Sequence, residues 1–413
     1  MVMTYPEGHK PRYENFKLKG FLDETLREGA ERCLFTVEEN AKYDLTNKLI
    51  ESGVRDIIIG SGPQDPQLLY KCLYEQSKDV NTPKNVKYAF ILLLNSWEPI
   101  FEQFKHFPLE YLEQICISYG MVEYGQSEQL LEKVHAKFLA LGVKSFRVSL
   151  INNFSSGVDE EKYEGISYQI KRCVGLGITT VRVNDSLGTL YPETMGILAA
   201  NLVHDFPNVD FCLHAHNDRG LGLQNALESI YHGFNIIEGA VAGYGNRSGL
   251  PAIEVLAQIF KEKNIIIENI YFDIEKLHEA AALADEVFMT VPNIYRPYSG
   301  LIVNKENLGV LNIPDYLGVE RETDYFLNNV GLHINTVKKT LQAANYDENL
   351  TEDPQFISTI LNRLEERMTT IYSTKRDTFK VINDMISEFY TTDVMSASDI
   401  IELSQNLIES SYQ

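Results

Sequence analysis

The sequence lacks any apolar run long enough to cross a membrane. A membrane-spanning helix needs about 18 or more consecutive apolar residues, and the run Ile91–Leu94 is far shorter. Residues 1–19 are polar and mixed in charge, without the apolar stretch of a secretory signal. We therefore predict a polar N-terminal segment over residues 1–19, no membrane partner and no secretion.

Cysteine is scarce, and basic residues are outnumbered by acidic ones. The five cysteines are odd in number and have no Cys-x-x-Cys spacing, which favours free thiols in a reducing compartment over disulfides or a structural zinc site. We therefore expect a cytoplasmic protein. The 37 Lys and Arg residues against 58 Asp and Glu give a formal net charge of −21. Nucleic acids bind basic surfaces, so this charge argues against a nucleic-acid partner.

What the chain does contain is a regular alternation of short apolar runs with longer segments of helical periodicity. The eight runs, each of which we interpret as a strand, are Phe21–Leu26, Val54–Gly60, Val86–Leu94, Leu112–Tyr119, Val143–Ile151, Ile178–Asn184, Val209–His216 and Ile236–Val241. Helical segments between them include Thr36–Ser52, Ser127–Leu141 and Asp159–Leu176. Three of the helical segments are followed, just before the next strand, by a glycine in the position of a C-cap: Gly53, Gly142 and Gly177.

Eight strand–helix repeats are what a (β/α)8 barrel requires. The alternative, a doubly wound open sheet, usually has fewer repeats and a glycine-rich phosphate loop after its first strand, which the segment Arg27–Ala30 does not resemble. We predict an α/β fold, a TIM barrel over residues 20–270. A mainly helical C-terminal region over residues 271–413 should follow it.

The C-terminal region has its own pattern. We predict helices over Ile274–Val287, Ile334–Asn345, Ile357–Tyr372 and Thr378–Phe389, a linker over Pro292–Pro297, and a polar tail at the end of the chain.

The segment Cys212–Asp218 holds the first candidate site residues, His214 and His216. Side chains alternate along a strand, so both imidazoles point to the same face and can converge on one divalent metal. An isolated pair of this kind is more often two core histidines bonded to backbone. The metal interpretation gains weight from the other polar residues at strand ends.

In a TIM barrel the chemistry lies at the C-terminal ends of the strands. Applied to this sequence, the rule brings together polar segments that we assign to the C-terminal ends of five of the predicted strands. They are Asp23–Gly29, Arg147–Ser149, Arg182–Ser186, His214–Asp218 and Gly243–Gly249. Any one of them alone is an ordinary solvated strand end, but their coincidence at one face predicts a site.

Four motifs within these segments resemble the signature elements of the DRE-TIM metallolyase superfamily. They are DETLREG at 23–29, NDSLG at 184–188, HAHND at 214–218 and GYGNRSG at 243–249. The superfamily includes homocitrate synthase, 2-isopropylmalate synthase, 3-hydroxy-3-methylglutaryl-CoA lyase and 4-hydroxy-2-oxovalerate aldolase. The resemblance covers roughly residues 20–265, with the motifs in the same order.

The resemblance implies a divalent metal, of the kind Zn, Mn, Mg or Co, held by Glu28, His214 and His216. One carboxylate and two imidazoles leave open positions for a chelating 2-oxo acid. It also implies that Arg27 stabilises charge on the substrate carbonyl oxygen, a task suited to a fixed guanidinium. The implied activity is an acyltransferase reaction that condenses an acyl-CoA, expected to be acetyl-CoA, with a 2-oxo acid.

In the synthases a C-terminal extension swaps across a homodimer and delivers a catalytic histidine to the neighbouring site. The matching residue here is His333, which we expect to act as the base in a homodimer. Other polar residues of the five segments are expected to bind substrate: Arg147, Arg182, Ser186, Asn217 and Arg247 directly, and Asp23 and Thr25 as partners behind the direct contacts.

Two features separate the members of the superfamily. Glu28, where most other members have Asp, and Leu250, where many have an Asn ligand, both resemble homocitrate synthase. The fifth strand, however, reads Phe146–Ile151 without the catalytic Glu of the synthases. A non-catalytic metabolite-binding paralogue therefore stays open as an alternative. A lyase or aldolase that cleaves a hydroxy acid is another, because it would share the metal site and differ in the reaction direction.

Overall fold

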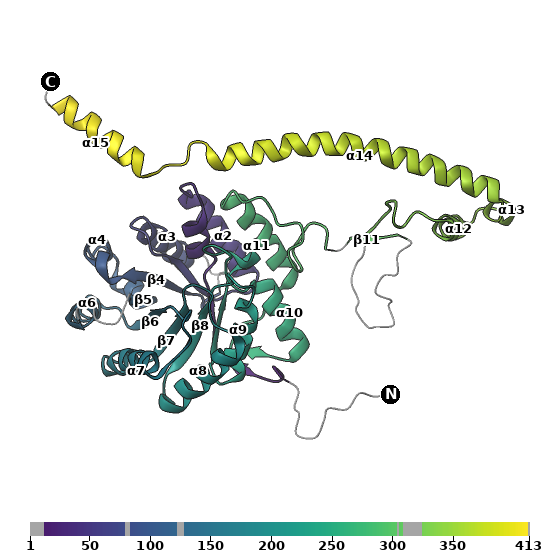
Figure 1. Ribbon diagram of the computed structural model, residues 1–413. Helices are drawn as coiled ribbons and strands as arrows, with labels where there is room; N and C mark the ends of the chain where they lie inside the picture. The colour runs from purple at the N-terminus through teal and green to yellow at the C-terminus, as the bar shows by residue number, and fades with distance from the viewer. Residues whose placement is uncertain (1–11, 79–82, 122–127, 304, 309–323, 412–413) are drawn as a thin grey trace, which may run out of the picture. The chain divides into compact units, whose positions relative to one another are not determined.

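Eight parallel strands form a closed barrel in the computed structural model, which describes residues 12–78, 83–121, 128–303, 305–308 and 324–411 (Figure 1). The barrel strands are β2 (Gly20–Asp23), β3 (Asp56–Gly60), β4 (Lys87–Leu93), β5 (Ile115–Met121), β6 (Ser145–Asn152), β7 (Thr180–Asp185), β8 (Asp210–Ala215) and β9 (Ile236–Gly239). Each strand pairs with the next along the chain, and β9 pairs back with β2. The predicted barrel and all eight predicted strands are confirmed.

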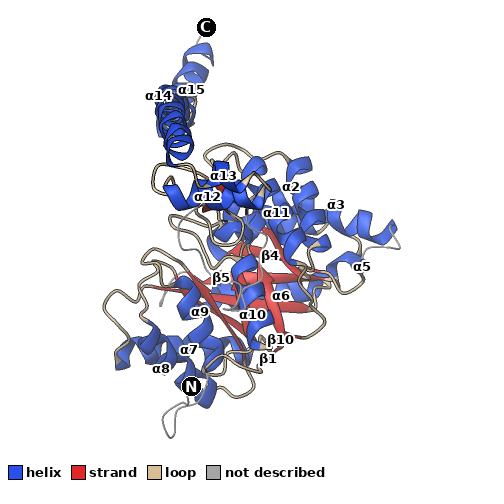
Figure 2. Ribbon diagram, turned by 90° about the vertical axis from the view of Figure 1, so that its right-hand side faces the viewer, coloured by secondary structure: helices blue, strands red, loops and turns tan. Residues whose placement is uncertain are grey.

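Helices surround the barrel on its outer side (Figure 2). They are α1 (Thr25–Arg32), α2 (Glu39–Glu51), α3 (Asp65–Lys78), α4 (Trp97–Phe104), α5 (Leu109–Leu112), α6 (Glu128–Leu141), α7 (Glu160–Gly175), α8 (Pro192–Asp205), α9 (Gly222–Tyr231) and α10 (Ile253–Lys263). The three predicted C-cap glycines, at 53, 142 and 177, have φ of +101°, +116° and +81°. An L side chain rarely adopts these angles, which is why glycine stands there.

Most strand boundaries differ from the prediction by one to three residues, and two of the differences change the local structure. The first strand ends at Asp23, because Thr25 and Leu26 already belong to α1. Arg27 and Glu28 therefore lie on a short helix and not in a loop. The fourth strand begins at Ile115, because α5 occupies residues that the apolar run assigned to the strand.

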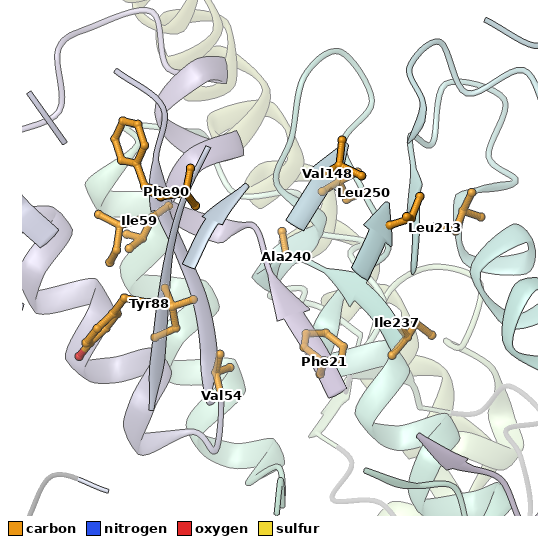
Figure 3. Close-up of a cluster of buried hydrophobic side chains, with 14 of the residues drawn as sticks. Phe21, Val54, Ile59, Tyr88, Phe90, Val148, Leu213, Ile237, Ala240 and Leu250 are labelled. Carbon is orange, nitrogen blue, oxygen red and sulfur yellow. The ribbon is translucent and has the colours of Figure 1, made fainter. Parts of the chain in front are cut away.

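The main apolar core lies between the sheet and the surrounding helices. Figure 3 shows part of it, with labelled side chains from several strands, among them Phe21, Val148, Leu213 and Ile237. Alternate residues of each strand face the barrel interior, where two small apolar clusters lie: Ile58, Ala89, Ile91 and Cys116, and separately Leu22, Cys212 and Ile236. Polar residues fill much of the remaining interior.

The strand pairings around the barrel are uneven. β2 and β9 match at four residue pairs, whereas β8 and β9 match only at Cys212 and Ile236, and β2 and β3 only at Asp23 and Ile57. The β2–β9 pair is therefore joined to the rest of the sheet by short ladders on both sides.

The predicted N-terminal segment is described in part, since residues 1–11 lie outside the described residues. Within it, β1 (Lys17–Leu18) pairs with β10 (Ile266–Ile267). The first compact unit of the chain runs to Pro292 and includes residues 297–299, so it extends past the boundary predicted at residue 270. The reason is α11 (Ile274–Val287), which packs against α2 as part of this unit. The division falls at the predicted linker, Pro292–Pro297.

The second unit contains residues 293–296 and 300–413, of which 304, 309–323 and 412–413 lie outside the described residues. Its elements are β11 (Lys305–Asn307), β12 (Asp324–Phe326), α12 (Ile334–Ala343), α13 (Glu348–Thr351), α14 (Pro354–Thr391) and α15 (Ala397–Ser411). The prediction of two helices over 357–389 was wrong, because α14 continues through residues 373–377. The predicted polar tail contains α15, whose apolar residues recur with helical spacing. No helix among the described residues is both long and apolar enough to cross a membrane.

Candidate metal centre

Three buried side chains from two parts of the barrel converge at the C-terminal ends of its strands. His214 lies on β8, His216 directly follows that strand, and Glu28 lies on α1 after β2. The Nε2 atoms of the two histidines are 3.2 Å apart, and Oε1 of Glu28 is 3.5 Å from Nε2 of His214. One ligand atom from each residue lies within 4.8 Å of the others. These are the three residues expected to hold a metal.

A second buried carboxylate determines which nitrogen of His214 faces this cluster. Glu238, on β9, is bonded to Nδ1 of His214. A carboxylate accepts hydrogen bonds, so Nδ1 carries the proton and Nε2 presents its lone pair toward Glu28 and His216. This is the arrangement in which a histidine binds a metal while its other nitrogen is anchored.

Burial keeps both histidines neutral. It lowers the pKa of His214 to about 3, against the opposing effect of Glu28. Burial, together with the charges of Arg247 and Arg27, also lowers the pKa of His216. Metal ligation requires neutral imidazoles, so the pair is ready to bind at neutral pH without losing protons.

The carboxylate of Glu28 has room for a further partner. Its Oε1 is buried and accepts no hydrogen bond among the described residues, although it forms an ion pair with Nη1 of Arg27 at 2.5 Å. Burial raises the pKa of Glu28, against the opposing effects of Arg27 and His214. Unpaired buried polar atoms are costly. A divalent metal bound by these three residues would satisfy Glu28 and use both facing imidazole nitrogens.

The charge of the site fits the same ion. Four carboxylates, those of Glu24, Glu28, Glu31 and Glu238, are paired with only two guanidiniums, those of Arg27 and Arg182. The excess of two negative charges, when all four are ionised, is what one divalent cation balances. The residues present therefore fit the predicted metal.

Arg27 is held beside the candidate ligands by carboxylates. Its Nε donates to Glu24 at 3.0 Å, and its Nη1 donates to Glu31 at 2.7 Å. Burial lowers the pKa of the guanidinium, but the three neighbouring carboxylates outweigh it and place the pKa above its ordinary value. Among the described residues no acceptor lies within bonding distance of Nη2, so this nitrogen is the one with a donor to offer a substrate.

Asp23 and Thr25 form a hydrogen-bonded pair next to the candidate ligands. The hydroxyl of Thr25 donates to Asp23 at 2.5 Å and accepts from the backbone nitrogen of Val241 at 2.9 Å. The pair ties the end of β2 to the loop that follows β9. Neither side chain is bonded to a candidate ligand, and their part in substrate binding stays a prediction.

Ser186, Asn217 and Arg247 lie on neighbouring loops of the same face. Arg247 donates to the carboxylate of Asp218 at 2.7 Å and to the carbonyl oxygen of Ser186 at 2.6 Å, which joins the loops after β7, β8 and β9. Asn217 accepts from the backbone nitrogen of Gly222 at the start of α9. The structure thus brings these three residues to one rim, and their part in substrate binding stays a prediction.

Arg147 does not join the site. It is the third residue of β6 and forms a bidentate ion pair with Asp56, the first residue of β3, with one bond at 2.9 Å. Both residues lie near the N-terminal ends of parallel strands, the end of the barrel opposite the candidate ligands. The expectation that Arg147 contacts substrate does not fit this placement, because its guanidinium is buried and already paired.

Arg182 is inside the barrel and not on its rim. Its side chain is completely buried and bonded to Glu24, Glu238 and Ser149. Direct substrate binding, as predicted, does not fit this burial.

His333 belongs to the second unit, where it is exposed at the N-cap of α12. Its Nδ1 accepts from the backbone nitrogen of Thr336 at 3.4 Å. Its role as a base stays a prediction.

The sequence prediction missed two residues of the centre, Glu24 and Glu238. Both had a signal. Glu238 is a charged residue in the middle of the eighth apolar run, and Glu24 follows Leu22 by two positions, on the same inward face. A charge that interrupts a barrel strand on its interior side is expensive and calls for a partner.

Comparisons with known proteins agree with the motifs. Residues 142–284 match the family model described as HMGL-like. The chain is 27% identical over 311 residues to homocitrate synthase from Sulfurisphaera tokodaii, a match that covers 71% of this chain and 64% of that protein. It is 26% identical over 333 residues to homocitrate synthase from Sulfolobus acidocaldarius, covering 75% and 68%. The matches thus span about two thirds of the length of these relatives.

The fold has counterparts among solved structures. HMG-CoA lyase from Brucella melitensis matches with a TM-score of 0.53 and 17% sequence identity, covering 67% of this chain and 100% of that chain. At this identity the likeness concerns the fold.

The closed barrel and the HMGL-like match over residues 142–284 agree with the predicted TIM barrel and with the resemblance to the DRE-TIM superfamily. The two relatives described above are named homocitrate synthase, whereas the structure from Brucella melitensis is named a lyase.

Proposed function

We propose that this chain catalyses a metal-dependent Claisen-type condensation of an acyl-CoA, acetyl-CoA in the first instance, with a 2-oxo acid. The observation that carries the proposal is the convergence of Glu28, His214 and His216 beside Arg27. Glu28 and Leu250 in their motif positions, and relatives named homocitrate synthase, favour a condensation over a cleavage.

The residues at the site have separate roles in this reaction. Glu28, His214 and His216 would hold the divalent metal, which when bound supplies Lewis-acid polarisation of a chelating 2-oxo acid. The free donor of Arg27 is directed at charge that develops on the substrate oxygen. The loops joined by Arg247 enclose the rim where a small acid would lie.

The reaction requires one proton to be removed and one thioester to be hydrolysed. A base takes a proton from the acyl methyl group, the resulting carbanion forms a carbon–carbon bond to the keto carbon, and the keto oxygen becomes a hydroxyl. Water then cleaves the thioester and releases coenzyme A and a tertiary hydroxy acid. The base is assigned to His333 of a second copy, by resemblance to the synthases.

A cleavage reaction and a non-catalytic binding role are the alternatives, and the interior of β6 favours the second of them. The residues of this strand that face inward are Arg147, Ser149 and Ile151, so β6 contributes no carboxylate to the site. Ser149 accepts a hydrogen bond from Arg182 at 2.8 Å. A non-catalytic binding protein needs no such carboxylate, whereas a lyase or aldolase stays open because it would use the same metal site in the opposite reaction direction.

A substrate panel separates the candidates. Mixing the protein with acetyl-CoA, a divalent metal and a series of 2-oxo acids should release free thiol with one of the acids. Release of pyruvate or acetyl-CoA from a hydroxy acid, without thiol release in the panel, would replace the proposal by a lyase. Binding without turnover would replace it by the non-catalytic alternative.

Metal analysis tests the site itself. Glu28→Gln, His214→Ala and His216→Ala should each lose bound metal and keep a folded barrel, as judged by circular dichroism. His204→Ala, which changes an exposed histidine bonded to Asp205, is the matched control and should keep the metal. Full occupancy in His216→Ala would remove this residue from the site.

The homodimer and the cytoplasmic location stay predictions. The dimer is supported by the apolar face of α14, described below, and the location by free thiols at all five cysteines.

A further inference from the structure

The interior of the barrel holds a completely buried arginine directly behind the candidate ligands. Arg182, on β7, donates from Nε to Glu238 at 2.9 Å and from Nη1 to Ser149 at 2.8 Å, and its Nη2 is bonded to Glu24. The same Nη2 lies 3.3 Å from Nδ1 of His214. We call Glu24, Arg182 and Glu238 the arginine brace.

Stability alone does not account for the brace. Three charged groups are removed from water here, with exposed fractions of 0% for Glu24 and Arg182 and 2% for Glu238. The desolvation of such groups often equals or exceeds their mutual attraction, and apolar side chains in their place are often as stable or more so. The interior next to them already holds an apolar cluster that includes Leu22 and Cys212.

The contacts of the brace lead to one ligand, His214. Glu238 bonds to Nδ1 of His214 with one oxygen and accepts from Arg182 with the other. Arg182 therefore fixes the direction of the Glu238 carboxylate, and Glu238 fixes the proton and the ring plane of His214. Glu24 completes the chain, since it bonds both Arg182 and Arg27.

We propose that the arginine brace is a positioning device that holds the Nε2 atom of His214 ready for the metal. Arg182 acts through Glu238 and touches neither metal nor substrate. The inference rests on the proposed metal site. It adds to that site residues that position a ligand and do not themselves bind metal or substrate. Partners behind a ligating histidine typically contribute 10- to 100-fold in metal affinity.

The barrel contains a matched control. Arg147 and Asp56 form another buried bidentate ion pair in the same interior, at the opposite end of the strands. Among the described residues, neither is bonded to Glu28, His214 or His216. A variant of either arginine removes a buried guanidinium, but only Arg182 is connected to a candidate ligand.

The test compares Arg182→Met with Arg147→Met in the full chain. Affinity for Zn²⁺ alone is measured by competition with a chromogenic chelator, and the absorption spectrum of the Co²⁺-loaded protein reports the geometry of the ligands. We expect Arg182→Met to bind about 10- to 100-fold more weakly and to change the Co²⁺ spectrum. Arg147→Met should match the parent in both measurements, even where its thermal stability falls.

Glu238→Gln covers the case in which Arg182→Met does not fold. It keeps the volume but removes the charge that selects the Nδ1 proton, so it should also weaken Zn²⁺ binding. Nitrogen-15 shifts of His214 give a readout in the metal-free protein, and the parent should show the proton on Nδ1.

Affinity and Co²⁺ spectrum equal to the parent in the folded variant, or an Nε2 proton in the parent, would overturn the brace and leave the metal site standing. A parent that binds no metal would overturn both.

Discussion

At the scale of single residues, Arg27 combines a fixed position with one uncommitted donor. We predict that Arg27→Lys keeps the charge and the metal but lowers turnover by about 10²-fold, the effect of losing one preorganised donor to a developing oxyanion. An ammonium is a point charge and cannot bond Glu24 and Glu31 while also presenting a donor in a fixed plane. Steady-state kinetics with the active 2-oxo acid, with metal content measured in parallel, checks this. Parental turnover in the lysine variant would move the charge stabilisation to another group.

Asp23 should make the stability of the fold depend on pH. Burial raises its pKa to about 8, and its Oδ2 has no hydrogen-bond partner among the described residues, so the folded protein holds a proton there at neutral pH. Between the ordinary pKa of 3.8 and about 8 the folded state binds more protons than the unfolded state. The contribution of Asp23 to stability is therefore present at low pH and lost as pH rises through this window.

The variant Asp23→Asn removes this titration while it keeps an acceptor for Thr25. The stability of the parent relative to the variant should fall as pH rises from about 5 to about 8. Urea unfolding of both metal-free proteins at each pH measures the difference, and other titrating groups cancel because both proteins contain them. A difference that stays constant with pH would show that Asp23 is ionised in the fold.

The candidate metal ligands could be predicted from the sequence because their spacing along the chain determines that they meet. Alternation on a strand places His214 and His216 on one face, and a barrel places Glu28 at the same end. Arg147 was misplaced because β6 continues beyond it to Asn152, which leaves Arg147 near the opposite end of the barrel. Arg182 was misplaced because its side chain faces the interior, and the register of the whole barrel decides this. Glu24 and Glu238 become visible only once partners on other strands are known.

At the scale of elements, α14 presents an apolar seam. Residues spaced alternately three and four apart along this helix are apolar at eight of ten positions, with Lys375 and Thr378 as the exceptions. The apolar ones are Ile357, Leu361, Leu364, Met368, Ile371, Ile382, Met385 and Phe389. The first part packs within its own unit against α12, whereas Ile371, Ile382 and Met385 are about half exposed or more. Such a repeat is typical of helices that pair with a like helix.

We predict that the seam contributes to the homodimer. The double variant Ile382→Asp and Met385→Asp should shift the protein from dimer to monomer, as measured by light scattering after size exclusion. Lys380→Asp, on the opposite side of α14, is the control and should leave the dimer intact. A dimer that survives the double variant would place the interface elsewhere.

His333 requires a substitution chosen for its position. It caps α12 through Thr336, so an alanine would remove a cap as well as a base, whereas asparagine is also a good N-cap. If His333 is the base, His333→Asn should lower turnover by about 10²- to 10⁴-fold with α12 intact. Mixed dimers of His333→Asn and Glu28→Gln should then regain part of the activity. A fully active His333→Asn protein would leave His333 as a cap alone.

The elements were largely predictable because hydrophobic periodicity and C-cap glycines mark them locally. α14 was not predicted as one helix, since the stretch around Lys375 interrupts the apolar pattern without interrupting the backbone. The seam continues on both sides of it, and helix formation is cooperative over that length.

At the scale of the whole molecule, metal binding should be coupled to folding. The ligands come from residues about 190 positions apart and exist as a set only in the closed barrel. A metal at 100 times its dissociation constant should stabilise the fold by about 2.7 kcal/mol. Urea unfolding with Zn²⁺ and with a chelator measures the gain, and His216→Ala should show almost none. An equal gain in that variant would indicate binding at some other place.

Because the strand pairing around the barrel is uneven, a bound ion would also stabilise the barrel itself. Glu28 follows β2, whereas His214 lies on β8 and His216 directly follows that strand, so the ligand set spans the junction where β8 and β9 share a single matched pair. An ion held there would link the two sides of the most weakly paired part of the barrel. Backbone amides of β9 should then exchange with solvent deuterium more slowly in the metal-loaded protein than in the metal-free protein. Amides between β4 and β5, which share six matched pairs, should exchange at the same rate with and without metal.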